Sequence, residues 1–458
     1  MKQLNRRDFL RYSAISTAMV SPLMSMLGAL STLEAAETAS GYKALVCVLL
    51  EGGADFFNMV VPRENSSYEA YKNVRKNLAI PQESLLPVDH ANINRNNPLK
   101  YGFRGNMQHL QQLFTSQNLA VVANVGTLLK PTTLDDIRKG AALPPQLFAH
   151  NTQRDLWMRG DARGVQKTGW AGRTSDTFYP VPNPYFNITA GGNNVMQQGG
   201  MAEAMAFSEP SVSPDTMTSY GFGPEAGGEE LGTLYQKLYE QKSKDPHKLM
   251  AAFAQQRLFK LNQQEVLKDL FDNVASFEMF STGVHESGKP LGKQLELVAQ
   301  ILSVKDNFPN KTKRQIFFVN HHGWDTHDSD NEHQAGYLSE SLGAFYTALK
   351  QLGIENQVTT FTISDFGRSL SPNGAGSDHG WGNHAFVMGG SVKGGDIYGT
   401  MPAIAPNSPD AWEERMIPTM AVESYLAALV RWFGATDHEL YKIFPNLSSF
   451  GTTLPAFL

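Results

Sequence analysis

Apolar positions along the chain alternate between short runs of strand length and longer stretches with helical spacing. The short apolar runs lie at residues 43–50, 119–125, 315–320, 358–364 and 384–388. An uninterrupted run of this length is typical of a strand that is buried on both faces. Between the runs, apolar residues recur on one helical face, as in 338–352 and 426–433. Strands that alternate with helices predict an α/β fold with a mainly parallel sheet and helices on both faces.

The middle of the chain differs from the rest in composition and periodicity. Residues 180–246 are rich in glycine, asparagine, methionine and proline and show little periodicity, which is typical of long loops. Residues 247–304 return to a helical and more charged pattern. Because the candidate site residues come from both ends of the chain, we expect one domain over 41–458. A loop-rich and helical insertion is predicted within it, at about 180–304.

The first residues predict where the protein works. Arg6-Arg7 stands in the sequence Asn-Arg-Arg-Asp-Phe-Leu and is followed by a small-residue apolar segment at 14–33. This pattern is typical of a twin-arginine export signal, here expected at 1–36. A membrane anchor is the alternative, but serine, threonine, proline and glycine interrupt the segment. We expect the twin-arginine translocase to export the chain, leaving a periplasmic or extracellular protein without a stable membrane span.

Composition excludes several classes of protein. The net charge is −5 and no basic stripe of the kind that binds nucleic acid is present. The single cysteine, Cys47, lies in an apolar run and is expected to be a small buried hydrophobe, so no disulfide framework exists. The absence of a Gly-x-Gly-x-x-Gly motif after a strand and of a cysteine cluster argues against a redox enzyme.

Carboxylate and imidazole side chains follow the predicted strands. Asp55 comes after the first strand, and Asp325, His327 and Asp365 come after two later strands. The carboxyl ends of parallel strands share one edge of the sheet, so we expect these side chains to meet there. Carboxylates that lie so close repel one another unless a cation sits between them. The sequence therefore predicts a site for a divalent metal ion.

A glycine-punctuated segment after Asp365 adds further candidates. His379 and His384 are candidate metal ligands, whereas Asp378 is expected to cap its turn. Arg368 has two possible roles. Its guanidinium could form an ordinary salt bridge with Asp365, or it could offer a planar fork to a tetrahedral oxyanion in the site.

Four motifs resemble a known family, the bacterial domain-of-unknown-function 1501 family. The motifs are Gly52–Asn58, Leu147–Gln153, Gly323–His327 and Ser364–Gly380. They occur in the family's order, and the resemblance covers essentially the whole chain after the export signal. The family is grouped with the alkaline-phosphatase-like hydrolases, which include sulfatases and phosphomutases. The resemblance therefore implies an alkaline-phosphatase-like α/β fold.

The resemblance also implies roles for individual residues. The implied metal ligands are, in chain order, Asp55, Asp325, His327, Asp365 and then His379 or His384. Asn58 and Asp378 are also candidates for substrate contact, with turn capping as the other role of Asp378. Phe366 departs from the superfamily pattern, which commonly has an imidazole or amide there. The ion would be zinc, calcium, magnesium or manganese, between which the sequence does not distinguish.

The nucleophile is the second departure. The resemblance places it near residues 146–153, where Ala149 stands at a position that is often serine in relatives. Thr152 is the only hydroxyl in this motif, and His150 is a candidate catalytic, capping or core residue. A threonine nucleophile, attack by water and absence of catalysis all stay open.

Two hypotheses follow from the sequence. The first is an exported metal-dependent hydrolase of a phosphate or sulfate ester, in a small molecule or a polymer. The second is a non-catalytic exported protein of the same fold that binds a partner or a cell-envelope polymer. Metal content and the presence of a nucleophile distinguish the two.

Overall fold

The computed structural model describes residues 41–88, 100–207, 228–255, 257–258, 274–308 and 312–458. The predicted export signal at 1–36 lies outside these ranges. In the described part of the chain, no helix is both long enough and apolar enough to cross a bilayer.

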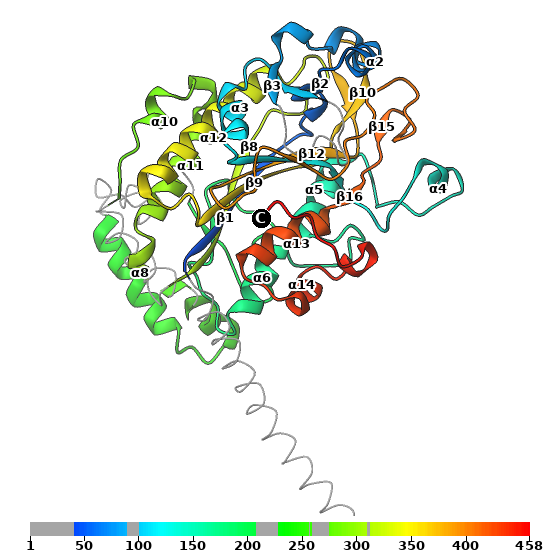
Figure 1. The fold of residues 1–458 in the computed structure, drawn as a ribbon. Helices are drawn as coiled ribbons and strands as arrows, with labels where there is room; N and C mark the ends of the chain where they lie inside the picture. The colour runs from blue at the N-terminus through cyan, green and yellow to red at the C-terminus, as the bar shows by residue number, and fades with distance from the viewer. Residues whose placement is uncertain (1–40, 89–99, 208–227, 256, 259–273, 309–311) are drawn as a thin grey trace, which may run out of the picture.

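A nine-stranded sheet forms the centre of the fold (Figure 1). Its strands follow the order β13-β5-β12-β9-β1-β8-β6-β7, and β16 also pairs with β5. The bounds are β1 (Lys43–Leu50), β5 (Leu119–Gly126), β6 (Asn187–Thr189), β7 (Met205–Ala206), β8 (Arg314–His321), β9 (Val358–Ser364), β12 (Asn383–Met388), β13 (Ile397–Tyr398) and β16 (Met420–Ala421). β1 runs parallel to both β8 and β9, whereas β12 is antiparallel to both β5 and β9. The predicted α/β fold with a mainly parallel sheet is confirmed.

Helices cover both faces of this sheet. Alternate residues of β1 point to opposite faces. Ala44, Val46 and Val48 pack in one core with α3 (Gln108–Thr115), α11 (Lys289–Ser303) and α12 (Glu332–Leu352). Leu45, Cys47 and Leu49 pack in a second core with α6 (Trp170–Phe178), α13 (Val422–Phe433) and α14 (Asp437–Ile443) (Figure 1). The continuous apolar run of β1 is explained by this double burial, and Cys47 is a buried free thiol.

The predicted insertion at 180–304 contributes to the sheet and to one of its covering layers. β6 pairs with β8, and β7 pairs with β6 at the end of the sheet. The same stretch contains α8 (Gly228–Lys242), α10 (Met279–Thr282) and α11. Apolar residues of α10 and α11 pack in the first core. Residues 208–227 and 259–273 lie outside the described ranges.

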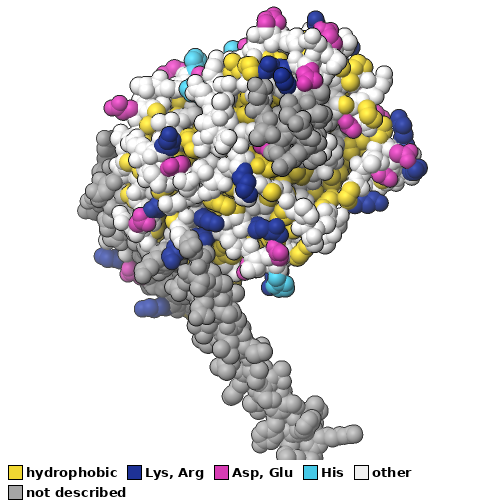
Figure 2. All heavy atoms as spheres, in the orientation of Figure 1, with side chains coloured by type: hydrophobic (Ala, Val, Ile, Leu, Met, Phe, Trp, Pro, Cys, Tyr) yellow, Lys and Arg dark blue, Asp and Glu magenta, His cyan; other side chains and the backbone are white. Residues whose placement is uncertain are grey.

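Smaller elements lie near the carboxyl ends of the central strands. They comprise the sheet β2 (Val60–Pro62), β4 (Tyr101–Phe103) and β3 (Leu86–Val88), the hairpins β10 (Arg368–Pro372)–β11 (Ser377–His379) and β14 (Ala411–Trp412)–β15 (Arg415–Met416), and the helices α2 (Asn65–Arg75), α4 (Leu134–Arg138) and α5 (His150–Arg159). On the face shown in Figure 2, cationic and anionic side chains are both present and interspersed.

A buried carboxylate lies at the start of α13. Glu423 is fully buried, and its Oε1 accepts hydrogen bonds from the Ala162 backbone N–H (2.8 Å) and from Asn446 Nδ2 (3.2 Å). Burial raises the pKa of Glu423 from 4.5 to about 7. The folded state therefore binds this proton at pH values at which the unfolded chain has released it.

This difference predicts a loss of stability as the pH rises. Between the unfolded and folded pKa values the folded state holds more protons, so the free energy of unfolding falls with pH and levels off above about pH 7. Glu423→Gln keeps the neutral form at every pH. Relative to the wild type, the variant is expected to gain up to about 3 kcal/mol between about pH 5 and about pH 8. Urea unfolding at both pH values measures this, and parallel pH profiles of the two proteins would contradict it.

Candidate metal centre

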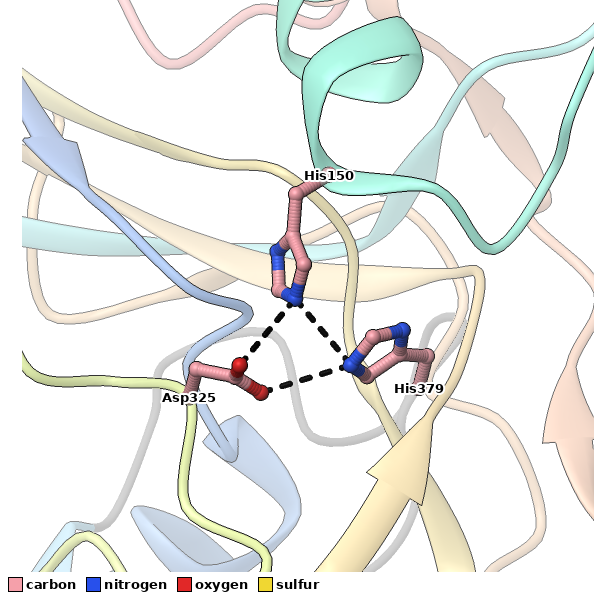
Figure 3. Close-up of side chains that lie close together, drawn as sticks. All are labelled: His150, Asp325 and His379. Carbon is pink, nitrogen blue, oxygen red and sulfur yellow. Dashed lines mark hydrogen bonds and ion pairs between the residues drawn. The ribbon is translucent and has the colours of Figure 1, made fainter.

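Three side chains from distant parts of the chain converge at the carboxyl edge of the sheet (Figure 3). His150 is the first residue of α5, Asp325 lies in the loop after β8, and His379 ends β11. His150 Nε2 lies 3.0 Å from His379 Nε2 and 3.3 Å from Asp325 Oδ2. Asp325 Oδ1 lies 3.3 Å from His379 Nε2. Each of the three residues offers one ligand atom, and these atoms lie within 4.8 Å of one another.

The orientation of His150 is fixed by a buried carboxylate. Asp365 directly follows β9, its side chain is fully buried, and its Oδ2 lies 2.7 Å from His150 Nδ1. A carboxylate oxygen accepts, so Nδ1 carries the proton and Nε2 faces the cluster. The hydrogen bond with Asp365 raises the pKa of His150 against the opposing effect of burial. Burial raises the pKa of Asp365 in turn.

His379 is oriented by the backbone. Its Nδ1 donates to the carbonyl oxygen of Phe148 at 2.8 Å, so its Nε2 also faces the cluster. Arg415 Nε donates to the carbonyl oxygen of His379 at 2.9 Å. Burial lowers the pKa of His379, which favours the neutral imidazole.

Asp325 is held by a buried arginine. Arg368 lies opposite His379 in the β10–β11 hairpin, and its NH1 donates to Asp325 Oδ1 at 2.9 Å. Burial opposes ionisation of Asp325, but the hydrogen bond from Arg368 and the neighbouring charges outweigh it and lower the pKa of this carboxyl. Glycine at position 52 allows the loop that carries Asp325 to lie close to the backbone after β1, because a Cβ at Gly52 would lie 2.4 Å from the Asp325 backbone nitrogen.

The three residues fit a divalent cation. Both imidazoles donate through Nδ1, so in their neutral forms two Nε2 lone pairs and an anionic carboxylate face one another without a proton between them. A cation in this position would satisfy all three groups. Imidazole and carboxylate are ligands that suit zinc and several other divalent metals, and histidine ligands oriented by a carboxylate or a carbonyl are common in such sites.

His327 lies on the solvent side of the same cluster. Its Nε2 is 3.0 Å from Asp325 Oδ1 and 3.1 Å from His379 Nε2. Its Nδ1 lies 3.5 Å from Asp378 Oδ1, and Asp378 is exposed and accepts a hydrogen bond from Asn373 Nδ2 at 2.6 Å. The structure therefore brings His327 to the cluster and Asp378 to its rim.

Asp55 and Asn58 instead form a buried network with α2. Asp55 Oδ2 pairs with Arg75, whose side chain is fully buried. Arg75 Nε donates to Asn58 Oδ1 at 3.1 Å, and the Tyr71 hydroxyl donates to the same oxygen at 2.8 Å. The Arg75 guanidinium thus neutralises Asp55. The side chain of Asn58 accepts hydrogen bonds from residues of the same network.

Two other candidates also make contacts away from the cluster. His384 is buried on β12 against the rings of Phe56 and Phe57, and its Nδ1 accepts from the Asn124 N–H at 3.0 Å. Burial lowers the pKa of His384 to about 3. The hydroxyl of Thr152 donates to Gln146 Oε1.

Arg154 and Glu51 lie beside the cluster and were not among the residues predicted from the sequence. Arg154 follows His150 by one turn of α5, and its NH1 pairs with Glu51 Oε1 at the end of β1. The spacing of four residues from His150 is the sequence signal that could have indicated Arg154, because such residues share one side of a helix.

The comparison with protein families supports the predicted resemblance. Residues 310–424, which include Asp325, Asp365 and His379, match the model of the family described as Protein of unknown function (DUF1501). The match covers two of the four motifs, Gly323–His327 and Ser364–Gly380, and bears out the predicted resemblance over these residues. No curated protein matches the sequence.

Several solved structures align with most of the chain at low similarity. Ps i-CgsB in complex with k-i-k-neocarrahexaose shares 11% identity, with 90% of this chain and 77% of the other covered and a TM-score of 0.35. A sulfatase from Pseudoalteromonas sp. shares 10% identity, with 90% and 71% covered and a TM-score of 0.33. An alkaline phosphatase from the Antarctic bacterium TAB5 shares 11% identity, with 88% and 98% covered and a TM-score of 0.29.

Proposed function

We propose that the protein is a metal-dependent hydrolase of phosphate or sulfate esters. The supporting observation is the convergence of His150 Nε2, His379 Nε2 and Asp325, with both Nδ1 protons committed elsewhere. A divalent ion bound there would supply positive charge for an ester oxyanion and lower the pKa of the attacking group. The cluster supports the proposed cofactor, and the choice of phosphate or sulfate esters rests on the family resemblance.

The residues around the cluster have positioning roles in this proposal. Asp365 and the Phe148 carbonyl hold the two imidazoles with Nε2 facing the ion. Arg368 keeps Asp325 ionised and in place. His327 is a further ligand candidate at the exposed side, and Asp378 at the rim is a candidate for substrate contact.

The start of α5 provides no hydroxyl at the cluster. Ala149 is the N-cap residue of this helix, and the Thr152 hydroxyl is bonded to Gln146. We therefore infer that water, rather than a side chain, attacks the ester. The same observation favours the second candidate function, a non-catalytic exported protein that retains the fold and a metal ion.

One experiment separates the two functions. Protein purified without chelator is analysed for metal content and then assayed with an aryl phosphate and an aryl sulfate in the presence of zinc, magnesium, manganese or calcium. The proposal predicts a bound divalent metal and hydrolysis of at least one ester, with turnover largely retained in Thr152→Ala. Folded, metal-loaded protein that hydrolyses neither ester would favour the non-catalytic function.

We also propose that the protein reaches the periplasm or the extracellular space by the twin-arginine route. Arg6 and Arg7 carry this proposal, and they lie outside the described residues. The translocase recognises the guanidinium pair as an address rather than as charge. The double substitution Arg6→Lys/Arg7→Lys is therefore expected to leave the precursor in the cytoplasm. Cell fractionation measures this, and unchanged export of the double variant would refute the proposal.

A further inference from the structure

Helix α5 extends the metal centre along the edge of the sheet. His150 and Arg154 lie one turn apart and share one side of the helix. His150 reaches Asp365 after β9, and Arg154 reaches Glu51 after β1, which is the strand next to β9. Arg154 therefore lies beside the His150–Asp365 pair, and its charge contributes to lowering the pKa of Asp365 against the larger effect of burial.

Glu51 is a fixed anchor for the Arg154 guanidinium. Its Oε1 pairs with Arg154 NH1. Its Oε2 accepts from Asn320 Nδ2 at 2.6 Å and lies 2.8 Å from His322 Nδ1. Burial opposes ionisation of Glu51, but these contacts outweigh it and lower its pKa. The backbone carbonyl of Glu51 also accepts a hydrogen bond from the N–H of Trp324, which precedes Asp325. This bond joins Glu51 to the loop that carries Asp325.

Arg154 differs from Arg368 in the donors that it leaves available. The Arg368 side chain is fully buried, and its nitrogens already donate to Asp325, Gly52, Thr326 and Ser377. It has no exposed edge for a ligand. The Arg154 side chain is 30% exposed, and among the described residues Glu51 is its hydrogen-bond partner, through NH1. The Nε and NH2 donors of Arg154 remain available to a ligand.

We infer, resting on the proposed function, that Arg154 binds the tetrahedral oxyanion of the ester and that Glu51 positions its guanidinium for this contact. An arginine held at NH1 can present its Nε–NH2 edge to two oxygens in parallel, which is the geometry preferred by phosphate and sulfate groups. The surrounding carboxylates of Asp325, Asp365 and Glu51 would repel an oxyanion. Arg154 supplies a fixed positive charge among them in addition to the ion.

Direct binding of inorganic phosphate and of sulfate tests this inference. Metal-loaded protein is titrated with each anion by calorimetry, and the metal content of each variant is measured in parallel. Arg154→Ala is expected to weaken binding by about 10- to 100-fold, the range for lost hydrogen bonds to a charged group, with unchanged metal content. Arg154→Lys keeps the positive charge but lacks the planar guanidinium with its two parallel N–H donors. This variant is expected to recover only part of the affinity. Glu51→Gln, which loosens the anchor, is expected to fall between the wild type and Arg154→Ala.

Arg431→Ala is the matched control, because it also removes one positive charge. Arg431 lies on α13 in an exposed pair with Asp437, so this variant is expected to bind both anions like the wild type. Wild-type affinity of Arg154→Ala for both anions, loss of metal from that variant, or absence of anion binding by the wild type would each overturn the inference. Arg154-dependent anion binding without hydrolysis of any ester would uphold it and overturn the proposed function. The anion whose affinity falls more in Arg154→Ala indicates the ester class.

Discussion

Replacing Asp325 with asparagine is expected to abolish most of the metal binding of the protein. Asp325 is the anionic member of the three-residue cluster, and its carboxylate contacts both His150 Nε2 and His379 Nε2. The buried Arg368 guanidinium would remain beside the cluster without its carboxylate partner and would repel a cation. Changes in residues that only orient metal ligands lower affinity by about 10- to 100-fold, so we expect loss of this ligand to lower it by more than about 100-fold.

A matched variant in the same loop makes this result specific. Asp328 is exposed and lies one residue after His327, so Asp328→Asn removes the same charge without touching the cluster. Equilibrium dialysis against zinc followed by elemental analysis measures both variants. Retention of zinc by Asp328→Asn and its loss from Asp325→Asn is the expected outcome. Equal zinc content in the two variants would remove Asp325 from the metal site.

Arg75→Met is expected to lower the free energy of unfolding by about 3–5 kcal/mol, because it leaves a buried carboxylate without its cation. Arg75 is fully buried and pairs with Asp55. Its NH1 also donates to the carbonyl oxygens of Ser369 and Leu370, at 2.9 and 3.1 Å. The substitution therefore also leaves two backbone acceptors on β10 without this donor. Urea unfolding followed by circular dichroism measures the change.

A double-mutant cycle shows whether Asp55 and Arg75 act as a pair. Asp55→Asn/Arg75→Met removes the uncompensated charge, so the double variant is expected to lose less stability than the sum of the two single variants. Asp55→Asn alone is expected to keep the wild-type metal content, since Arg75 already neutralises Asp55. Additive losses would refute the pairing. A fall in the metal content of Asp55→Asn would instead show that Asp55 is a ligand, as the family resemblance implied.

Much of the central sheet could be predicted from the sequence, because its strands are buried on both faces. The apolar runs at 43–50 and 358–364 coincide with β1 and β9, and the run at 315–320 lies within β8. The direction of β12 could not be predicted, because a continuous apolar run indicates burial but carries no information on orientation. β6 and β7 have three and two residues and lie in a segment without periodicity, so no pattern marked them.

The candidate site was predicted less completely. Asp325 and His379 follow from motif order, and the structure brings them together with His150. The network of Asp55 depends on Arg75, and only the packing of α2 brings that guanidinium to the strand end. The donors of Arg368 are used by Asp325 and by backbone carbonyls of two separate loops, which no local pattern reveals. In both cases the deciding contact joins segments that are far apart in the sequence.

In the proposed function, a divalent ion held by His150, Asp325 and His379 supports ester hydrolysis. The most direct measurement is the rate of aryl phosphate and aryl sulfate hydrolysis before chelation, after removal of the metal, and after its return in stoichiometric amount. We expect a measurable rate for at least one ester, its loss in the metal-free protein, and its recovery in the wild type but not in Asp325→Asn. A rate that is unaffected by complete removal of the metal from folded protein would contradict it.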